Sequence, residues 1–541
     1  MTPQPFVSTA AEIPSASSQA VDVLVVGGGI NGAGIARDLS GRGLKVLLTE
    51  KDDLAAHTSS SSTKLIHGGL RYLEYYEFAM VRKSLAEREV LLNSAPHIMW
   101  PLRFVMPHDT SAKSARPVWM IRIGLFLYDH LAKREMLASS STIDLRSHAT
   151  GKPLKAMFKK GFVYSDGWVD DARLVVLNAI DARERGAEVL TRWRCTDAKR
   201  SLSHWQVQLE NAQGDMRQVT ARALVNAAGP WAAQFLGRAA HAPKTKSLRL
   251  IKGSHIVVPK MFEHDHAYIF QNPDKRIIFA IPYEGDFTLI GTTDVEYSGS
   301  VDTVKIDPSE VTYLCEQASR YFEKPVSAAD VVWSYCGVRP LLDDESGDPS
   351  AITRDYALEL DTSAAPLLNV WGGKLTTFRK LSEEAADLLA APLNNVKGAW
   401  TRDAVLPGGN LAEWVTAQTG ESGLKEDGFN RFAAAVAQRY PHLSRQLAFR
   451  LARGYGTRVD KLLGSGNPED MGIEVAPGLF EVELNYLHRT EWACTAHDVL
   501  WRRTKLGLHF TAAQRAAVSD WCSGNWTSKP DESLPLVSTW N

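Results

Sequence analysis

The chain has 541 residues, 44% of them hydrophobic and 23% charged, a globular balance over a length that predicts two or three domains. Lys and Arg total 61 against 62 Asp and Glu, so the net charge of −1 gives no basic excess of the kind typical of nucleic-acid-binding proteins. The 5 cysteines form no Cys-x-x-Cys motif, so we expect neither a disulfide framework nor a metal site and favour a reducing, cytoplasmic location.

The N-terminal segment, residues 1–20, is polar and rich in Pro, Ser and Ala. It has neither the basic nor the apolar stretch of a secretory signal, and we interpret it as a disordered lead-in. No apolar run in the chain reaches the roughly 18–20 residues that span a bilayer, so any membrane contact is expected to be peripheral.

Residues 21–50 carry the strongest motif. The apolar run Val21–Val26 predicts a buried parallel strand, and a helix is predicted from Ile30 to about Gly41. They are joined by G-x-G-x-x-G, whose glycines allow a tight turn, a close approach to a pyrophosphate and helix–strand packing. A second strand, 45–48, leads to an acid expected to accept ribose hydroxyls, which favours FAD or NAD over NADP. The predicted cofactor contacts are Gly27, Gly29, Ile30, Asn31, Gly32 and Glu50.

The competing interpretation of this motif is a glycine-rich turn in an unrelated α/β protein, and the next segment bears on the choice. A run of hydroxyl side chains, TSSSSTK at residues 58–64, follows Glu50 without a second long helix. A flavin that stays bound between turnovers is wrapped by more chain than NAD usually is, so this run favours FAD. The alternative is a mobile serine-rich linker. The predicted FAD contacts of this segment are Ser60, Ser62, Thr63, Lys64 and His67.

Helical and strand patterns alternate further along the chain. Residues 72–92 predict one long helix, 162–193 a turn, a helix and a strand, and 204–232 a hairpin ending in a glycine turn. Residues 249–297 predict an antiparallel sheet. Within 366–389 a strand opens into a helix through a glycine pair, which aims backbone N–H groups at an electron-rich ligand. The two glycine turns supply further predicted FAD contacts, which are Gly229, Gly373, Lys374, Leu375 and Thr376.

These patterns predict an α/β fold, α+β overall, made of a Rossmann-like FAD domain, an antiparallel-sheet substrate or cap domain and a helical C-terminal domain. The oxidoreductase region covers 21–398, and the C-terminal domain covers 399–541, with the linker-like stretch LPGGN near its start. Within the first region the FAD domain is expected at about 21–100, 160–240 and 331–398, and the cap domain at about 101–159 and 241–330.

The segment RPVWMIRIGLFLYDHLAKR, residues 116–134, is apolar and aromatic with basic flanks. It is too short to span a bilayer and is interrupted by an arginine. It could lie in the membrane interface with Trp119 and Phe126 inserted and Arg116, Lys133 and Arg134 at the headgroups. The alternative is an ordinary buried helix of the cap domain.

Taken in order over about residues 21–510, the motifs GGGINGAGIARD, TSSSSTKLIHGGLRYLE, WVDDARL, IKGSHIVVP, IGTTDVEY, GVRPL and GGKLTTFRK resemble the aerobic FAD-dependent glycerol-3-phosphate dehydrogenases. The resemblance implies an FAD domain of the glutathione-reductase and D-amino-acid-oxidase type. It also implies oxidation of sn-glycerol 3-phosphate to dihydroxyacetone phosphate by hydride transfer from C2 to FAD N5. Reoxidation by ubiquinone or menaquinone, peripheral attachment to the inner face of the cell membrane, and a homodimer are further implications.

The dianionic phosphate of such a substrate needs cationic donors, for which arginine and lysine are best suited. The resemblance places Arg71, Arg339 and Lys374 on the substrate, with additional hydrogen bonds from Tyr72 and Thr292. The competing interpretation of any one of these arginines is a surface ion pair.

Removal of a hydride from C2 also requires a base for the hydroxyl proton, and histidine is the usual choice. His255 is slightly favoured over His67, which could instead lie against the flavin, and an alkoxide held by Arg339 is the third alternative. The competing functions are a glycerol-3-phosphate oxidase that uses oxygen, another amine or amino-acid oxidase of the same fold, and a non-enzymatic flavoprotein acting as scaffold or redox sensor.

Overall fold

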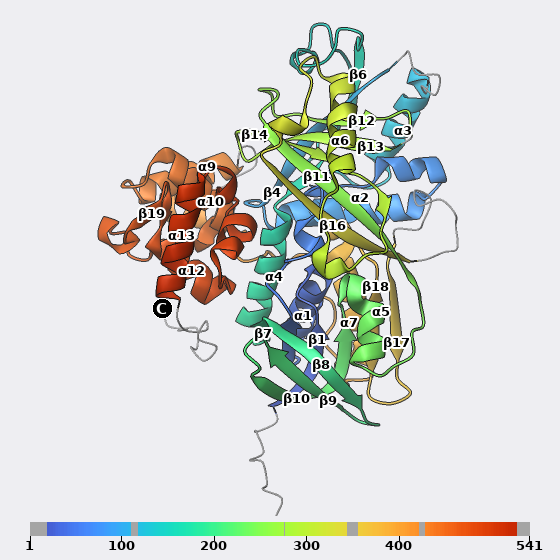
Figure 1. The fold of residues 1–541 in the computed structure, drawn as a ribbon, viewed down its shortest axis with the longest axis vertical. Helices are drawn as coiled ribbons and strands as arrows, with labels where there is room; N and C mark the ends of the chain where they lie inside the picture. The colour runs from blue at the N-terminus through green and yellow to red at the C-terminus, as the bar shows by residue number, and fades with distance from the viewer. Residues whose placement is uncertain (1–18, 110–116, 275, 343–354, 421–427, 527–541) are drawn as a thin grey trace, which may run out of the picture.

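The computed structural model describes residues 19–109, 117–274, 276–342, 355–420 and 428–526. Most of the expected lead-in, Arg116 and the last residues of the C-terminal domain lie outside this range. Figure 1 shows a sheet flanked by helices at the base, a second sheet above it, and a helical C-terminal part at one side. The predicted fold class is therefore confirmed.

The first sheet has the strand order β17-β18-β10-β1-β2-β7. β1 (Gln19–Val26) is parallel to both of its neighbours, and the residues from Val23 to Val26 are buried because both faces of the sheet are covered. β9 pairs with the edge of β10 and with β8. The other bounds are β2 (Val46–Glu50), β7 (Glu188–Thr191), β8 (Trp193–Arg200), β9 (Trp205–Asn211), β10 (Met216–Asn226), β17 (Ala357–Asp361) and β18 (Leu367–Trp371).

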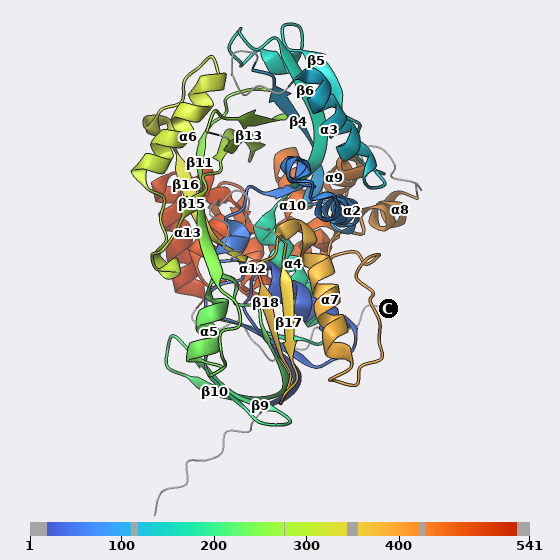
Figure 2. The same cartoon turned by 90° about the vertical axis from the view of Figure 1, so that its right-hand side faces the viewer.

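Helices cover one face of this sheet. α1 (Ile30–Gly41) packs against both α4 (Asp171–Glu184) and α7 (Phe378–Ala390), and Figure 2 shows α7 and α4 on this side of the strands. The approach of α1 and α7 is close, because a Cβ atom at Gly34 would lie 2.5 Å from Ser382 Oγ. On the other face, α5 (Ala232–Arg238) and the β8–β9 pair enclose a separate apolar core.

The second sheet has the order β15-β11-β14-β13-β12-β4-β6-β3, with β16 beside β11 and β5 beside β6. It includes β6 (Lys160–Val169) and β16 (Trp333–Leu342), although the sequence boundaries placed both segments with the FAD domain. The turn expected at 162 is thus part of a strand. The remaining elements are β3 (Leu65–Ile66), β4 (Met99–Pro107), β5 (Ser141–Asp144), β11 (Leu248–Pro259), β12 (Ala267–Gln271), β13 (Ile277–Tyr283), β14 (Phe287–Gly291), β15 (Val295–Glu296) and the covering helix α6 (Pro308–Tyr321).

The prediction of one helix over 72–92 is wrong. A 3-10 turn, Leu70–Tyr75, is followed by α2 (Phe78–Ser94), and Tyr76 between them has a φ of 61°. A residue in the left-handed region cannot continue a right-handed helix, so the chain changes direction there. α3 (Val118–His130) packs beside this 3-10 turn.

The C-terminal part has a core of its own and is joined to the FAD-domain side by buried ion pairs. The carboxylate of Asp53 accepts hydrogen bonds from Arg502 at 2.6 Å and from Arg503 at 2.7 Å, and Glu491 binds Arg173 of α4. A π-helix, Asp498–Arg503, supplies these arginines. The elements are α8 (Leu411–Thr419), α9 (Gly428–Arg439), α10 (Arg445–Tyr455), α11 (Val459–Leu463), β19 (Glu474–Ala476), β20 (Leu479–Phe480), α12 (Glu481–Glu491) and α13 (Ala512–Asn525).

Candidate functional site: a dinucleotide cradle and a cationic substrate pocket

The glycine turn between β1 and α1 leaves no room for side chains. Gly27 has a φ of 114°, and a Cβ atom there would lie 2.4 Å from the carbonyl oxygen of Ala227. At Gly32 a Cβ atom would lie 1.8 Å from the carbonyl oxygen of Gly27. α1 begins at Ile30, with Gly29 as its N-cap, so the chain presents a helix N-terminus at a turn that a pyrophosphate can approach.

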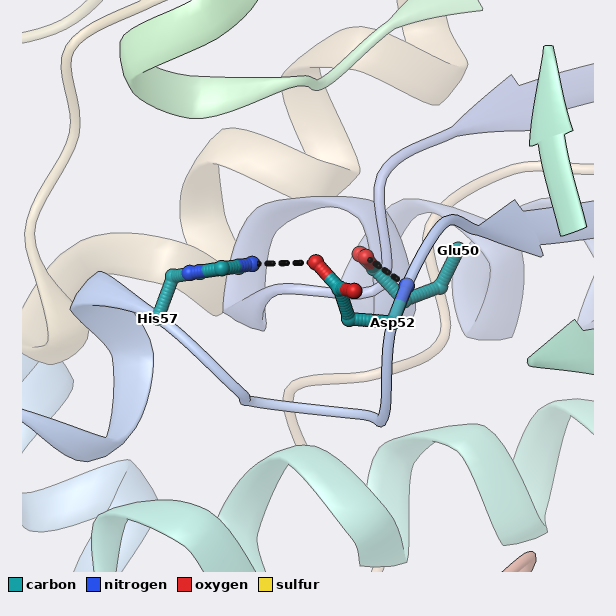
Figure 3. A group of neighbouring side chains, drawn as sticks. All are labelled: Glu50, Asp52 and His57. Atoms are coloured by element: carbon teal, nitrogen blue, oxygen red, sulfur yellow. Dashed lines mark hydrogen bonds and ion pairs between the residues drawn. The ribbon is translucent and has the colours of Figure 1, made fainter. Parts of the chain in front are cut away.

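Glu50 ends β2 in a nearly buried position beside this turn. Its carboxylate accepts hydrogen bonds from the backbone N–H of Gly28 at 2.6 Å and of Asp52 at 2.9 Å, and burial raises its pKa. Figure 3 shows that Asp52 in turn bonds His57, at 2.7 Å. The ligand atoms of Glu50, Asp52 and His57 lie within 4.8 Å of one another. Each oxygen of the Glu50 carboxylate already accepts one backbone N–H group, so part of its lone-pair capacity is used within the protein.

The serine run is held in place, which rules out the mobile-linker interpretation. Residues Thr58–Ser60 form a 3-10 turn, and Ser59 Oγ accepts the backbone N–H of Ile30 at 3.0 Å. Ser62 Oγ donates to Asp171 at 2.7 Å. Lys64, which is 1% exposed, donates to the same carboxylate at 2.7 Å and to the carbonyl oxygen of Ser60 at 3.1 Å. The loop is therefore fixed between α1 and α4.

Strand β16 covers the other side of the serine run. Thr58 Oγ1 donates to the carbonyl oxygen of Val338 at 2.7 Å, and the Tyr335 hydroxyl donates to the carbonyl oxygen of Ser62 at 2.8 Å. A Cβ atom at Gly337 would lie 2.6 Å from Ser61 Cβ. The second sheet thus contacts the cofactor loop directly.

His255 of β11 lies at this junction. Its ring stacks on Tyr335 with 4.8 Å between centroids, and Nε2 lies 3.0 Å from Thr63 Oγ1. Burial, and after it the nearby charges of Arg339 and Lys64, lower the pKa of His255 well below its usual value. The ring is therefore neutral at physiological pH, and its buried Nδ1 has no hydrogen-bond partner within the part of the chain that the structure describes.

Arg339 lies on β16, opposite β11. It donates to Asp294 at 2.9 Å and to Thr292 Oγ1 at 3.1 Å. Residue 253 must be a glycine to leave space for this guanidinium, since a Cβ atom at Gly253 would lie 2.4 Å from Arg339 Nη2. The structure brings together two of the predicted substrate residues, Arg339 and Thr292. Arg339 lies on β16, next to the strand of His255, and Thr292 directly follows β14, whose Gly291 is opposite His255.

A second group of predicted substrate residues surrounds the 3-10 turn after β3. Lys374 Nζ lies 4.4 Å from the centre of the Tyr72 ring, and Arg71 donates to the Tyr75 hydroxyl at 3.3 Å. The backbone N–H of His67 donates to Thr376 Oγ1 at 3.2 Å. His67 is followed by a glycine pair, and the 3-10 turn that carries Arg71 begins after it, at Leu70.

The second glycine pair meets the first cofactor helix. Asn31 Nδ2 donates to the carbonyl oxygen of Gly372 at 3.1 Å, and a Cβ atom at Gly373 would lie 2.8 Å from Asn31 Nδ2. Leu375 and Thr376 open the 3-10 turn that leads into α7. Gly229 begins the 3-10 turn after β10, with a φ of 54°. Predicted cofactor residues from distant segments thus converge at the carboxyl ends of β1, β10 and β18.

Sequence reasoning missed four side chains of this region: Ser59, Asp171, Asp294 and Tyr335. Asp171 lies in the motif WVDDARL, where two acidic residues precede an apolar helix. This pattern indicates a helix N-terminus and could have pointed to Asp171. Ser59 and the other two act through contacts across long sequence separations, which no local pattern reports.

A helix that begins at a glycine turn, with a buried acid at the end of the following strand, is typical of the dinucleotide-binding class of oxidoreductases. Residues 22–379 match the family described as FAD dependent oxidoreductase, and residues 399–522 match the C-terminal domain of alpha-glycerophosphate oxidase. A glycerol-3-phosphate dehydrogenase of Pseudomonas aeruginosa is 52% identical over 96% of this chain and 98% of its own length. The D-erythritol 1-phosphate dehydrogenase of Brucella abortus is 49% identical over 94% and 98%.

The solved structure of the glycerol-3-phosphate dehydrogenase from Bacillus halodurans complexed with FAD has a TM-score of 0.70 and 25% identity, covering 96% of this chain and 97% of that chain. The chain belongs to the FAD-dependent glycerol-3-phosphate dehydrogenase family, and its cofactor is FAD.

The substitution Gly32→Ala is expected to prevent FAD binding, because the new methyl group would lie 1.8 Å from the carbonyl oxygen of Gly27. The flavin-to-protein ratio of the purified protein measures this. Gly237→Ala is the matched control, since a Cβ atom there would meet only Lys244 Cε, at 3.6 Å. A Gly32→Ala protein with its full flavin complement would show that the turn does not set cofactor affinity.

Proposed function

We propose that this chain oxidises sn-glycerol 3-phosphate to dihydroxyacetone phosphate, with hydride transfer from C2 to FAD N5 and reoxidation by a membrane quinone, ubiquinone or menaquinone. The bound FAD supplies the hydride acceptor. The observation that carries the proposal is that Arg339 and a neutral His255 lie on adjacent strands, β16 and β11, and that His255 contacts Thr63 of the cofactor loop. The names of the close relatives support the same substrate class.

Three cations are proposed to hold the substrate. A guanidinium has five N–H donors, so Arg339 retains donors for a substrate oxygen beyond its bonds to Asp294 and Thr292. Arg71 and Lys374 lie around Tyr72 at the second group and are assigned to the phosphate. With these assignments, the substrate phosphate lies at the cations near Tyr72 and the C2 hydroxyl lies near β11.

His255 is proposed as the base that takes the C2 hydroxyl proton. Its neutral ring can accept a proton, and Nδ1 is free of a hydrogen-bond partner within the described residues. The stack on Tyr335 and the contact with Thr63 fix the ring plane. Arg339, which lowers the pKa of His255, also stabilises negative charge on the substrate oxygen, so the two residues favour the same alkoxide-forming step.

Anaerobic addition of glycerol 3-phosphate is expected to bleach the flavin absorbance, and a quinone analogue should restore it without stoichiometric peroxide.

The Arg71→Ala variant should keep FAD while its kcat/KM falls by about tenfold or more, because a charge-assisted contact to the phosphate is lost. D-erythritol 1-phosphate tests the substrate class, since it offers the same phosphate on a longer polyol. Intact bound FAD that no polyol phosphate bleaches would refute the proposal, and peroxide as the main product would favour an oxidase.

Replacing His255 by Asn should lower kcat by about 10²–10⁴, the usual contribution of general acid–base catalysis, with FAD retained. Because the pKa of His255 is lowered, its proton-accepting form persists as the pH falls, so wild-type kcat should stay level from about pH 8 to about pH 6.5. His241→Asn, at an exposed histidine paired with Asp197, is the control. A large loss in His67→Asn with little in His255→Asn would move the role to His67.

Membrane attachment at the cytoplasmic, inner face is proposed to use α3. Among the described helices, none is long and apolar enough to cross a bilayer. Trp119 and Phe126 are 61% and 57% exposed, so α3 is not the buried cap helix that the sequence left open. The exposed apolar residues of α3 and of the neighbouring segment 75–78 form a surface that we call the α3 face. They are Trp119, Met120, Ile123, Phe126, Leu127, Tyr75, Tyr76 and Phe78. This face adjoins the turn that carries Arg71, which brings a lipid-dissolved quinone close to the site.

Trp119→Ser combined with Phe126→Ser should reduce co-sedimentation with anionic phospholipid vesicles by about tenfold or more, because roughly 1.5–3 kcal/mol is lost for each large apolar side chain withdrawn from the bilayer. Turnover with a water-soluble acceptor should be unaffected. Leu202→Ser is the control, since Leu202 is 87% exposed but lies on the far loop between β8 and β9. Undiminished sedimentation of the double variant would exclude the α3 face.

A further inference from the structure

A cleft of about 1660 Å³ lies between the C-terminal part and the rest of the molecule. α10 lines one side of it, the segment from His97 to Leu102 and the first turn of α4 line another, and loops of the second sheet at 260–265 and 282–286 close it. Figure 1 shows α10 facing β4 and α4 across this region. None of the residues placed in the substrate pocket lines it, so the cleft is separate from the flavin site.

Arg453 of α10 is the unusual side chain in this cleft. Neighbouring arginines of the C-terminal part are paired with carboxylates, Arg450 with Glu483 and Arg458 with Glu184. Arg453 has no carboxylate partner among the described residues; its hydrogen bonds go to the carbonyl oxygens of Pro96 and His97, at 3.5 and 3.4 Å. Its burial lowers its pKa to about 9.

Aromatic rings hold this guanidinium in a defined orientation. Its central carbon lies 3.4 Å from the ring centre of Phe429, 4.2 Å from that of Trp100 and 5.6 Å from that of Phe449. Rings stabilise a cation across its faces but accept no hydrogen bonds in its plane. The N–H groups at the edge of the fork therefore keep most of their capacity for an oxyanion.

His97 supplies a second unsatisfied group at the same place. The side chain is fully buried and lines the cleft, and no described residue forms a hydrogen bond with either ring nitrogen. The backbone fixes the ring, since Cβ atoms at Gly456 and Gly408 would lie 2.9 Å from His97 Cγ and 3.2 Å from Nε2. Burial, together with the charges of Arg173, Arg453 and Arg458, lowers its pKa to about 3. The ring is neutral and offers one N–H donor beside three guanidinium groups.

We propose that this end of the cleft is a binding site for a small oxyanion, a phosphate monoester or a carboxylate, held by Arg453 and His97 beside Trp100. An oxyanion would pair the one guanidinium of this cluster that lacks a carboxylate and would accept the buried imidazole N–H. Acidic side chains on the sheet loops, Glu263, Asp265, Glu284 and Asp286, line other parts of the cleft and restrict an anion to the α10 end. The cleft exceeds the roughly 300–1,000 Å³ of typical ligand sites, so the anion occupies only part of it.

The proposal is tested with the FAD-bound full chain by equilibrium dialysis against radiolabelled inorganic phosphate, with acetate as the competing carboxylate. The wild-type protein should bind one equivalent of phosphate more than Arg453→Gln, and the residual affinity of Arg453→Gln at this site should be at least about tenfold weaker. Its kcat/KM for glycerol 3-phosphate should be unchanged, because the substrate pocket is intact. Displacement by acetate would assign the site to carboxylates as well as phosphates.

Arg445→Gln is the matched control: it removes the same charge from the first turn of the same helix, at an exposed residue outside the cleft. Arg453→Lys keeps the positive charge, and His97→Asn keeps a polar side chain of similar shape. Each variant should bind phosphate more weakly while its flavin content is preserved. If Arg453→Gln, Arg453→Lys and His97→Asn all bind as much phosphate as Arg445→Gln, with the same affinity, the site does not exist.

Discussion

The buried ion pair between Lys64 and Asp171 holds the cofactor side of this protein together. Both side chains are almost inaccessible, and the carboxylate also accepts the hydroxyl of Ser62. Removing one partner of such a pair leaves an uncompensated buried charge, at a cost of about 3–5 kcal/mol. Lys64 itself has a φ of 60°, a conformation that a lysine adopts only when its surroundings determine it. The pair thereby fixes where the serine run ends and where β3 begins.

From that point the two sheets share one site. The loop held by Lys64 contacts α1 through Ser59 and β16 through Tyr335. The same strand carries Arg339, and its neighbour carries His255. Arg339 and His255, which we propose to act on the substrate, are therefore positioned by the second sheet, and the serine run links that sheet to α1 and α4. A displacement of this loop would alter both sets of contacts together.

Local sequence predicted the features that local chemistry dictates. The strand, glycine turn and helix of residues 19–41 appeared within two residues of expectation, because glycine spacing and apolar runs determine them directly. The break at Tyr76 was not predictable, since tyrosine carries no left-handed preference. The sequence also did not predict which sheet β6 and β16 join, because this depends on pairing between distant residues, such as Leu250 with Pro340, 90 positions apart. The cations were found from motifs, but their partners, such as Asp294, were not. The sequence around Arg453 carries no signal for a site, since a single helical arginine usually indicates a surface ion pair.

The strand order of the first sheet also governs how the protein is made. β1 pairs with β10, and β10 with β18, so the sheet and the cofactor cradle draw on segments that leave the ribosome far apart in time. At about 5–20 residues per second, the roughly 350 residues from Gly27 to Gly373 require on the order of 20–70 s of synthesis. The arginines that bind Asp53 emerge later still. A nascent chain therefore carries an open sheet edge until β18 has been synthesised, and Asp53 has no partner from Arg502 or Arg503 until the C-terminal part has followed.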